Sequence, residues 1–274
     1  MMEEKKQIKF NLSPSSLNTY FESPLLFYLK YIARVPDDTK VPVCYGLSGS
    51  IVHDCLEKYA RGDFDRDETY LSLAKEWQKQ DLCVHQDVKG CILDQNDYLR
   101  ALLNGMTIVD SHEDHICEEV ISFPLVENEN FKIGMKGIVD LQTTQKHNKK
   151  QIVADYKTSN RIDEGEGFKR QALFYNLLIY KKKNIIPKKS TFFYLKLNKR
   201  KDYVFTLDEM LAFEKEIERI AEEIISYNND IGKFPIGDIH SIFNSKKQAC
   251  LKEVQRRKNK GPQKELFDDE SIFI

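Results

Sequence analysis

The chain opens with a polar stretch and then shows an apolar pattern typical of helices. Ser13 followed by Pro14 is a favourable helix start, because serine caps free backbone amides and proline suits the first helical position. Leu17 and Tyr20 give this helix an apolar face. Pro24 interrupts the pattern, and we expect Phe27, Tyr28 and Tyr31 to continue it in a second helical piece.

The next segment combines a glycine-rich stretch with further helical periodicity. Glycine and serine in residues 46–50 predict a loop. A helix is expected over residues 51–59, which places His53 and Glu57 one turn apart on the same face. Residues 67–112 are expected to be mostly helical.

Beyond this helical half, the apolar pattern becomes that of strands. Strands are predicted over residues 120–126, 131–141 and 151–157, with polar turns at 127–130 and 146–150. Consecutive strands joined by short turns form a β-meander.

The remaining pattern alternates helix and strand. We predict a largely buried helix over residues 168–180, a strand over 190–197 and a long amphipathic helix over 207–225. After Asn229 the chain is expected to be irregular and polar. The order of elements therefore predicts a mixed α/β fold, with a central mixed β-sheet flanked by helices and an N-terminal helical region.

Charge adds information that the net value hides. Lys and Arg number 42 against 43 Asp and Glu, which excludes a histone-like protein that coats a polyanion and an acidic solvating tail. Residues 181–201 hold nine basic residues and no acid, whereas residues 205–230 hold eight acids and two basic residues. The first stretch is a candidate DNA track, formed by Lys188, Lys189, Lys199 and Arg200.

Sequence features also bear on the compartment. The six cysteines are scattered without a CxxC motif, the N-terminus lacks the apolar stretch of a signal peptide, and no run approaches the ~18 apolar residues of a membrane span. We expect an intracellular, soluble protein with reduced cysteines, from a bacterium or an infected host cell, without membrane contact.

Two acids and a lysine carry the strongest chemical signal. Asp140 ends one predicted strand, and Asp155-Tyr156-Lys157 ends the next. Because strand side chains alternate, Asp155 and Lys157 share a face, and an antiparallel hairpin brings Asp140 beside them. Two close carboxylates repel each other unless a cation is shared, and Mg²⁺ prefers such oxygen ligands. With Lys157 to hold the attacking water or to stabilise charge on phosphorus, the set suits metal-assisted phosphodiester hydrolysis.

The acid-x-Lys triplet alone is weak evidence. Triplets also start at Glu3, Glu4 and Asp38, in a charged terminus and a loop. Only Asp155 ends an apolar strand that follows a second strand with its own acid. Glu119, at the start of the first strand, is a further candidate for the same cleft.

Five segments in order resemble a known family. Residues 12–20, with Ser13, Ser15, Leu17 and Tyr20 in sequence, are similar to an opening S-x-S-x-L-x-x-Y helix. Ser23-Pro24 followed by Phe27-Tyr28 stands where that family often has Cys-Pro and Phe-Tyr, and Gly49 to His53 is similar to its G-x-x-x-H motif. Asp140, Asp155-x-Lys157 and the Gln171 to Tyr175 helix complete the resemblance to the PD-(D/E)XK nuclease superfamily, in its RecB/AddB-like branch.

The resemblance implies a restriction-endonuclease-like core and a DNA exonuclease that acts in recombination, repair or replication. It implies that His53, Asp140, Asp155 and the backbone carbonyl of Tyr156 hold Mg²⁺ or Mn²⁺. It also implies that Gln171 and Tyr175 line the active site and contact DNA, either single-stranded or at its ends, or orient Lys157. The products would carry 5′-phosphate and 3′-hydroxyl ends.

One departure from the family concerns its iron–sulfur members. Those use a cysteine at the position of Ser23 and three near the C-terminus, whereas only Cys250 follows Pro235 here. We predict no iron–sulfur cluster, and expect hydrophobic contacts to connect the N- and C-terminal regions instead.

Two alternatives to an active exonuclease remain open. An inactive nuclease-fold module that serves as a DNA-binding element or scaffold has no need of repelling carboxylates, so the intact Asp140, Asp155 and Lys157 count against it. An endonuclease of a restriction or mobile-element system would need a target-recognition domain, and none is evident in the sequence.

The predicted organisation is a polar extension over residues 1–11, a nuclease domain over 12–235 and a flexible tail over 236–274. Within the domain, 12–118 is the mostly helical part and 119–235 the sheet part. The tail is basic and then acidic. Its Gln263-x-x-Leu266-Phe267 resembles the motif with which bacterial replication proteins bind the sliding clamp. The competing interpretations are an acidic partner-recruiting tip and an unstructured solvated end.

Overall fold

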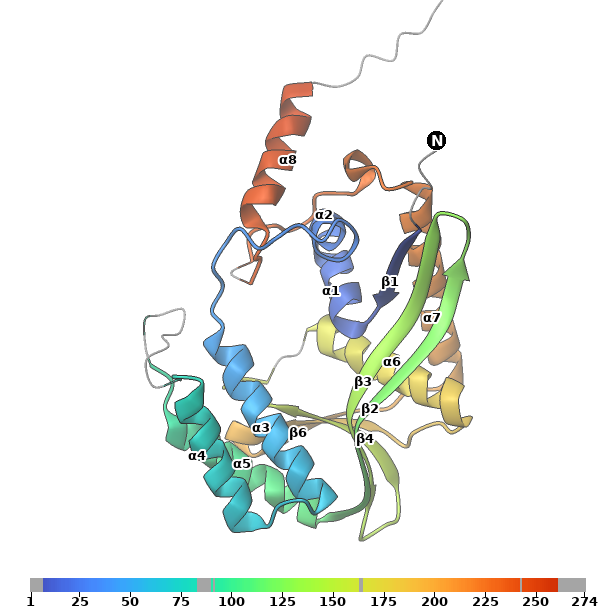
Figure 1. The fold of residues 1–274 in the computed structure, drawn as a ribbon. Coiled ribbons are helices and arrows are strands. Elements are labelled where there is room, and N and C mark those ends of the chain that lie inside the picture. The colour runs from blue at the N-terminus through green and yellow to red at the C-terminus, as the bar shows by residue number, and fades with distance from the viewer. Residues whose placement is uncertain (1–6, 83–89, 91, 163–164, 242, 261–274) are drawn as a thin grey trace, which may run out of the picture.

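The computed structural model describes residues 7–82, 90, 92–162, 165–241 and 243–260 (Figure 1). Its centre is a six-stranded mixed sheet, which confirms the predicted fold class. The strands are β1 (Ile8–Leu12), β2 (His112–Glu127), β3 (Phe131–Gln145), β4 (Gln151–Lys157), β5 (Ser190–Tyr194) and β6 (Lys199–Tyr203).

Strand β3 organises the sheet because three strands pair with it. Antiparallel β2 follows β3 along one edge. On the other edge, the first part of β3 pairs with parallel β1 up to Met135, and the last part pairs with antiparallel β4 from Leu141 on. The sheet continues through β5, parallel to β4, to antiparallel β6.

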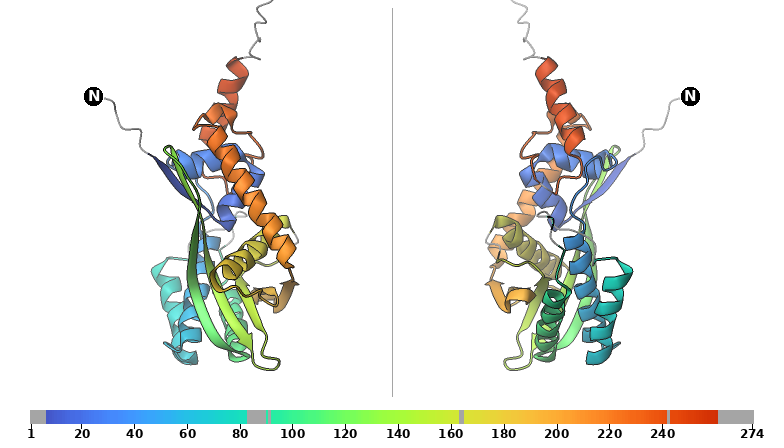
Figure 2. Two further views of the ribbon diagram at one scale, coloured as in Figure 1. Left: turned by 90° about the vertical axis from the view of Figure 1, so that its right-hand side faces the viewer. Right: turned by 90° about the vertical axis from the view of Figure 1, so that its left-hand side faces the viewer.

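Helices cover both faces of this sheet. Figure 2 shows α6 and α7 on one side of the long strands and α3, α4 and α5 on the other. The helices are α1 (Pro14–Glu22), α2 (Pro24–Phe27), α3 (Cys44–Arg61), α4 (Arg66–Lys79), α5 (Gln95–Asp110), α6 (Glu166–Lys183), α7 (Leu207–Ser226) and α8 (Lys247–Lys260), with a π-helical turn at Tyr28–Ile32 and 3₁₀ turns at Leu195–Leu197 and Ile231–Lys233.

Two apolar cores hold these layers together. The first joins α1, α2, α6 and α7 to β1 and to β3 as far as Val139. The second joins α3, α4 and α5 to the other end of the sheet, and includes Leu141 and Tyr156. Asp140 therefore lies where β3 passes from one core to the other.

Local sequence signals account for the first helices. Ser13 caps α1 by accepting a hydrogen bond from the amide of Ser16 at 3.2 Å, and Pro14 is the first helical residue. Ser23 caps α2 in the same way through the amide of Leu26, followed by Pro24. The predicted helix start at Ser13 is confirmed, and a second helical piece follows the first as expected.

The structure corrects several other expectations. Residues 46–50 lie inside α3 rather than in a loop, because tertiary packing outweighs the weak helix propensity of glycine. A Cβ on Gly49 would lie 3.2 Å from Thr158 Oγ1, so glycine permits close contact with the chain after β4. The strand predicted over 190–197 ends at Tyr194, and β6 was missed.

The C-terminal region also differs from the expectation of irregular chain after Asn229. Residues 247–260 form α8, which buries Cys250 and Glu253. Asp38 accepts hydrogen bonds from the amides of Gln248 and Ala249 at the start of this helix, at 3.0 and 2.7 Å.

Polar contacts join the two ends of the fold. Buried Ser23 donates to the carbonyl of Ile236, and the amide of Leu25 donates to the carbonyl of Pro235 at 2.9 Å. The rings of Tyr28 and Phe234 also pack, with centroids 4.7 Å apart. The connection expected from hydrophobic contacts alone thus includes backbone hydrogen bonds.

In the described part of the chain, none of the helices combines the length and apolar content that crossing a bilayer requires.

Close packing between the N- and C-terminal regions predicts that alanine substitutions at two glycines will lower the free energy of unfolding by different amounts. Gly62 and Gly237 both have positive φ, at 78° and 61°, but a Cβ on Gly237 would lie 2.3 Å from the carbonyl oxygen of Glu22, whereas space around Gly62 is open. Gly62→Ala is expected to cost about 1 kcal/mol, for the left-handed backbone alone. Gly237→Ala is expected to cost about 2–4 kcal/mol, because backbone must also move.

Urea unfolding of the two variants and the unaltered protein measures this difference. Equal losses of unfolding free energy would contradict the predicted close contact.

Candidate active site

The candidate site forms where β3 and β4 separate. Leu141 and Ala154 are the last paired residues of the two strands, so Asp140 and Asp155 come next on either side of the split. The side chain of Asp155 is 4 % exposed and that of Asp140 is 15 % exposed. The fold thus places two acids close together in a recess.

Helix α6 supplies a glutamine that links Asp155 to Lys157. Lys157 Nζ lies 2.6 Å from Asp155 Oδ1 and donates to Gln171 Oε1 at 3.2 Å. Gln171 Nε2 donates to Asp155 Oδ2 at 2.7 Å and to the Tyr175 hydroxyl at 3.2 Å. The Lys157 ammonium also lies 4.7 Å from the ring centroid of Phe168. These contacts fix the ammonium beside the acids.

His53 reaches the acids from α3, on the other core. Its Nδ1 lies 3.2 Å from Asp140 Oδ2, and its Nε2 lies 2.7 Å from the carbonyl oxygen of Tyr156. Burial lowers the pKa of His53, but the hydrogen bond to Asp140 and the charges of Asp140 and Asp155 outweigh it, so the pKa is raised. The structure therefore brings His53, Asp140 and the Tyr156 carbonyl together.

Glu118 on β2 is a member of the site that the sequence analysis missed. One ligand atom from each of His53, Glu118 and Asp140 lies within 4.8 Å of the others. Glu118 has φ of 51°, which non-glycine residues rarely adopt within a strand, so its backbone is strained beside the acids. Burial, and then the charges of Asp140 and Glu57, raise the pKa of Glu118.

The neighbouring Glu119, which the sequence suggested for the cleft, has a different environment. It pairs with Lys182 at 2.7 Å and with Lys183 at 3.3 Å. Counting back from the turn between β2 and β3 would place Glu119 opposite Asp140, but a register shift between Pro124 and Val126 moves Glu118 there instead. The register of the β2–β3 hairpin could have identified the acid opposite Asp140, but the shift of one residue in β2 hid Glu118 from this reasoning.

The donor set fits a divalent cation. Asp140 Oδ2 and Asp155 Oδ1 are buried and, apart from their ion pairs with His53 and Lys157, have no hydrogen-bond partner among the described residues. Burial, and then the charge of Asp140, raise the pKa of Asp155, while Lys157 and His53 lower it in part. Carboxylate oxygens, an imidazole nitrogen and a backbone carbonyl are ligands that Mg²⁺ or Mn²⁺ accepts.

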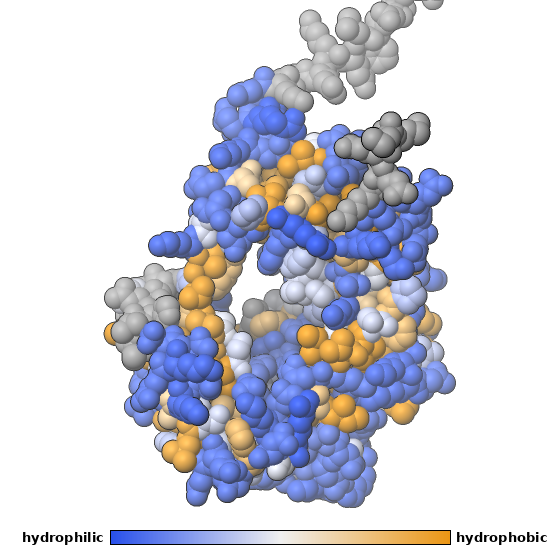
Figure 3. All heavy atoms as spheres, in the orientation of Figure 1, coloured by the Kyte–Doolittle hydropathy of each residue, from blue (hydrophilic) through white to orange (hydrophobic). Residues whose placement is uncertain are grey.

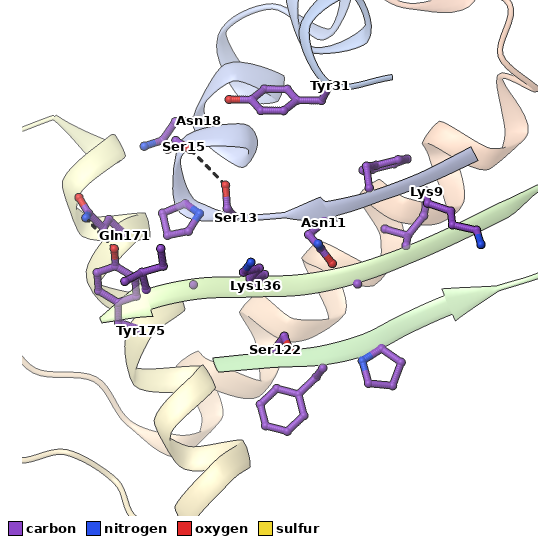
Figure 4. Close-up of a pocket in the computed structure, with 18 of the residues that line it drawn as sticks. Lys9, Asn11, Ser13, Ser15, Asn18, Tyr31, Ser122, Lys136, Gln171 and Tyr175 are labelled. Carbon is purple, nitrogen blue, oxygen red and sulfur yellow. Dashed lines mark hydrogen bonds between the residues drawn. The ribbon is translucent and has the colours of Figure 1, made fainter. Parts of the chain in front are cut away.

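Two cavities meet at these acids. The larger has a volume of about 1240 Å³ and is bounded by β1, α1, the π-helical turn and the β2–β3 hairpin. The smaller, of about 590 Å³, is lined by His53, Tyr156 and Lys157. Glu118, Asp140 and Phe168 line both. Figure 3 shows the hollow between the surfaces of α1 and α3, and Figure 4 shows Gln171 and Tyr175 at one end of the larger cavity.

The basic residues chosen from the sequence lie elsewhere. Lys188 and Lys189 come just before β5. The first residue of β5, Ser190, pairs with Val153 of β4, four residues before Lys157, so the two lysines lie toward the other end of these strands from the site. Lys189 is paired with Asp202 at 2.5 Å. Neither these two nor Lys199 and Arg200 line either cavity. Gln263, Leu266 and Phe267 of the tail motif lie outside the described residues.

Known proteins include a matching family and a distant structural neighbour. The family model described as the PD-(D/E)XK nuclease superfamily matches residues 11–236. A crystal structure from Eubacterium rectale, of a protein named "Putative exonuclease", is similar with a TM-score of 0.45 and 10 % sequence identity, over 82 % of this chain and 84 % of that one. No curated protein matches the chain.

The raised pKa of Asp155 predicts a pH-dependent stability of the metal-free protein. Between the ordinary pKa of aspartate and the raised pKa of about 6, the unfolded chain releases this proton more readily than the folded state, so the free energy of unfolding falls as pH rises through this window. Asp155→Asn removes the buried charge and keeps an acceptor for Gln171. We expect it to raise the melting temperature in EDTA by a few degrees, with a gain that grows from about pH 4 to about pH 6 and is constant above that.

Thermal melts across this range provide the measurement, and Asp63→Asn on the exposed surface is the matched control. A gain that stays constant or shrinks as pH rises across this range would contradict the buried charge at Asp155.

Proposed function

The chain belongs to the PD-(D/E)XK nuclease superfamily, and from this premise we propose that it is a divalent-metal-dependent deoxyribonuclease that digests DNA from its ends. The observation that carries the proposal is the group of acids at the split between β3 and β4, with His53 and Lys157 beside them. Hydrolysis of a phosphodiester needs positive charge near the phosphate and an oriented nucleophile. The residues of this site offer both.

His53, Glu118, Asp140 and Asp155, with the carbonyl of Tyr156, are the residues that would hold Mg²⁺ or Mn²⁺. When bound, the cation supplies charge that polarises the scissile phosphate. Both nitrogens of His53 face oxygen atoms, and an imidazole binds a cation only through a ring nitrogen that carries no proton.

Lys157 is the residue that would meet the phosphate. Its ammonium lies between Asp155 and Gln171, with the faces of Phe168 and Phe192 within 5.1 Å. Such confinement keeps the ammonium in one position, where it stabilises the negative charge that develops on phosphorus or orients the attacking water. Gln171 positions the lysine and Asp155 together, and Tyr175 supports Gln171.

Digestion of end-labelled linear DNA and of circular DNA, each single- and double-stranded, tests the activity with Mg²⁺, Mn²⁺ or EDTA. We expect release of nucleotides from linear DNA with either metal and none in EDTA. Asp140→Ala, Asp155→Ala and Lys157→Ala should each lower the rate by about 10²–10³-fold or more, since each removes a group that acts on the transition state. Cleavage of circles would support the endonuclease alternative, and binding without hydrolysis the inactive module.

Two adjacent glutamates provide a matched pair for this assay. Glu118→Gln removes an acid that faces Asp140, so the rate should fall and the Mn²⁺ concentration needed for half-maximal rate should rise. Glu119→Gln changes the same group one residue away, where it pairs with Lys182, and should leave both quantities unchanged. Equal behaviour of the two variants would remove Glu118 from the site.

The family and the tail motif support a role in DNA recombination, repair or replication, with the sliding clamp as a partner through Gln263, Leu266 and Phe267. Deleting residues 261–274 should leave digestion of naked DNA unchanged and abolish retention by an immobilised clamp. Retention that survives the deletion would assign clamp binding to another part of the chain.

A further inference from the structure

One face of the β1–β3–β2 part of the sheet leads directly to the acids. Along β3, alternate residues point to opposite faces. Phe131, Ile133, Met135 and Val139 are buried in the first core. Their neighbours line the larger cavity in the order Lys132, Gly134, Lys136, Ile138 and Asp140. This row of β3 residues runs along the floor of the cavity, which Ile133 and Gly137 also line, and ends at the candidate site.

The adjacent strands extend this row sideways. Lys9 of β1 and Glu127 of β2 flank Lys132 on either side, and Ser122 of β2 lies opposite Lys136. Val120 lies opposite Ile138, one row before the acids. Figure 4 shows Lys9, Asn11, Lys136 and Ser122 along this surface. The floor is three strands wide, with Pro124 of β2 opposite Gly134 and with Val120 and Ile138 forming an apolar last row.

Positive charge is concentrated on this floor and its wall. Five basic residues line the larger cavity, namely Lys9, Lys30, Arg34, Lys132 and Lys136. Arg34 Nη2 donates to the carbonyl of Lys9 at 3.0 Å, which fixes the wall to β1. Apart from Glu118 and Asp140 at the site, the acid that lines this cavity is Glu127, which pairs with Lys132 at 2.8 Å. Lys136 has no ion pair among the described residues.

The dimensions suit one strand of DNA. Lys136 precedes Asp140 by four residues, which is about 13 Å along a strand and spans a few nucleotides. Ile138 and Val120 are 45 % and 53 % exposed, and Tyr31 lies over the cavity from the π-helical turn (Figure 4), so apolar surface is available to bases and sugars. Asp140 and Asp155 are recessed, with side chains 15 % and 4 % exposed, which favours a flexible single strand over a rigid duplex.

We propose that this groove, defined by Lys9, Arg34, Lys132, Lys136 and Ile138, binds a single DNA strand and delivers its phosphates along β3 to Asp140. The proposal rests on the proposed function, because it assigns the substrate path of that site. It places the phosphate track on β1 and β3, in contrast to the track around Lys188 that charge along the sequence suggested.

Fluorescence anisotropy with a labelled oligothymidylate and with a duplex of equal length, both in EDTA, tests the groove. The unaltered protein should bind the single strand more tightly than the duplex. Lys136→Glu should weaken binding of the single strand by about tenfold or more and reduce the slope of log affinity against log salt by about 1. Lys150→Glu, an exposed lysine on the turn after β3, is the matched control and should change neither quantity.

Lys188→Glu and Lys199→Glu test the alternative track in the same assay. Loss of affinity in these variants, with Lys136→Glu unchanged, would overturn the groove proposal, as would tighter binding of the duplex. Thermal melts verify that each variant folds. Because binding is measured without metal, its outcome is separate from hydrolysis. If the protein binds DNA through Lys136 but digests no DNA with Mn²⁺, the groove proposal stands and the proposed activity is wrong.

Discussion

Mutual repulsion of buried carboxylates is the constraint on which the rest of this structure depends. Asp140 and Asp155 flank the split between β3 and β4, and Glu118 faces Asp140 from β2. Burial makes each charge costly, and proximity adds to the cost. The fold offsets it with cationic and hydrogen-bonding groups from other elements: His53 from α3, Lys157 from β4 and Gln171 from α6. The site therefore requires helices docked on both faces of the sheet, and the two apolar cores provide this.

The placement of α3 depends in turn on the C-terminal region. The segment that joins the π-helical turn to α3 contains Asp37 and Asp38, which bind Lys246 and the first amides of α8. The buried Ser23 and the backbone of Leu25 hold the chain before α8 through Ile236 and Pro235. Since the family match ends at residue 236, α8 lies beyond it and nevertheless anchors the approach to the helix that carries His53.

Signals that act within a few residues were sufficient to predict much of the fold. Ser13 and Pro14 mark a helix start whatever surrounds them, and the apolar run of β4 predicted its bounds, Gln151–Lys157. Features that depend on contacts with distant parts of the chain could not be predicted in this way. Gly49 lies inside α3, where a Cβ would come within 3.2 Å of Thr158 Oγ1, and α8 begins where the distant Asp38 accepts hydrogen bonds from the amides of Gln248 and Ala249. Sequence reasoning could name Asp140, Asp155 and Lys157, but a bulge in β2 decided that Glu118 rather than Glu119 joins them.

The distribution of charge along the sequence likewise differs from its distribution in the folded structure. A net charge of −1 says little about DNA binding, and the basic stretch 181–201 spreads its lysines over surfaces away from both cavities. The basic groove instead gathers residues from β1, the π-helical turn and β3, none of which is notably basic in sequence. Acids that hold a cation repel a phosphate backbone until the cation is present, so groups that attract DNA must lie apart from them yet in fixed relation. In the proposed groove, Lys132, Lys136 and Asp140 meet this requirement because they share one face of one strand, so the rise of β3 alone would set how far a phosphate bound at Lys136 lies from the acids.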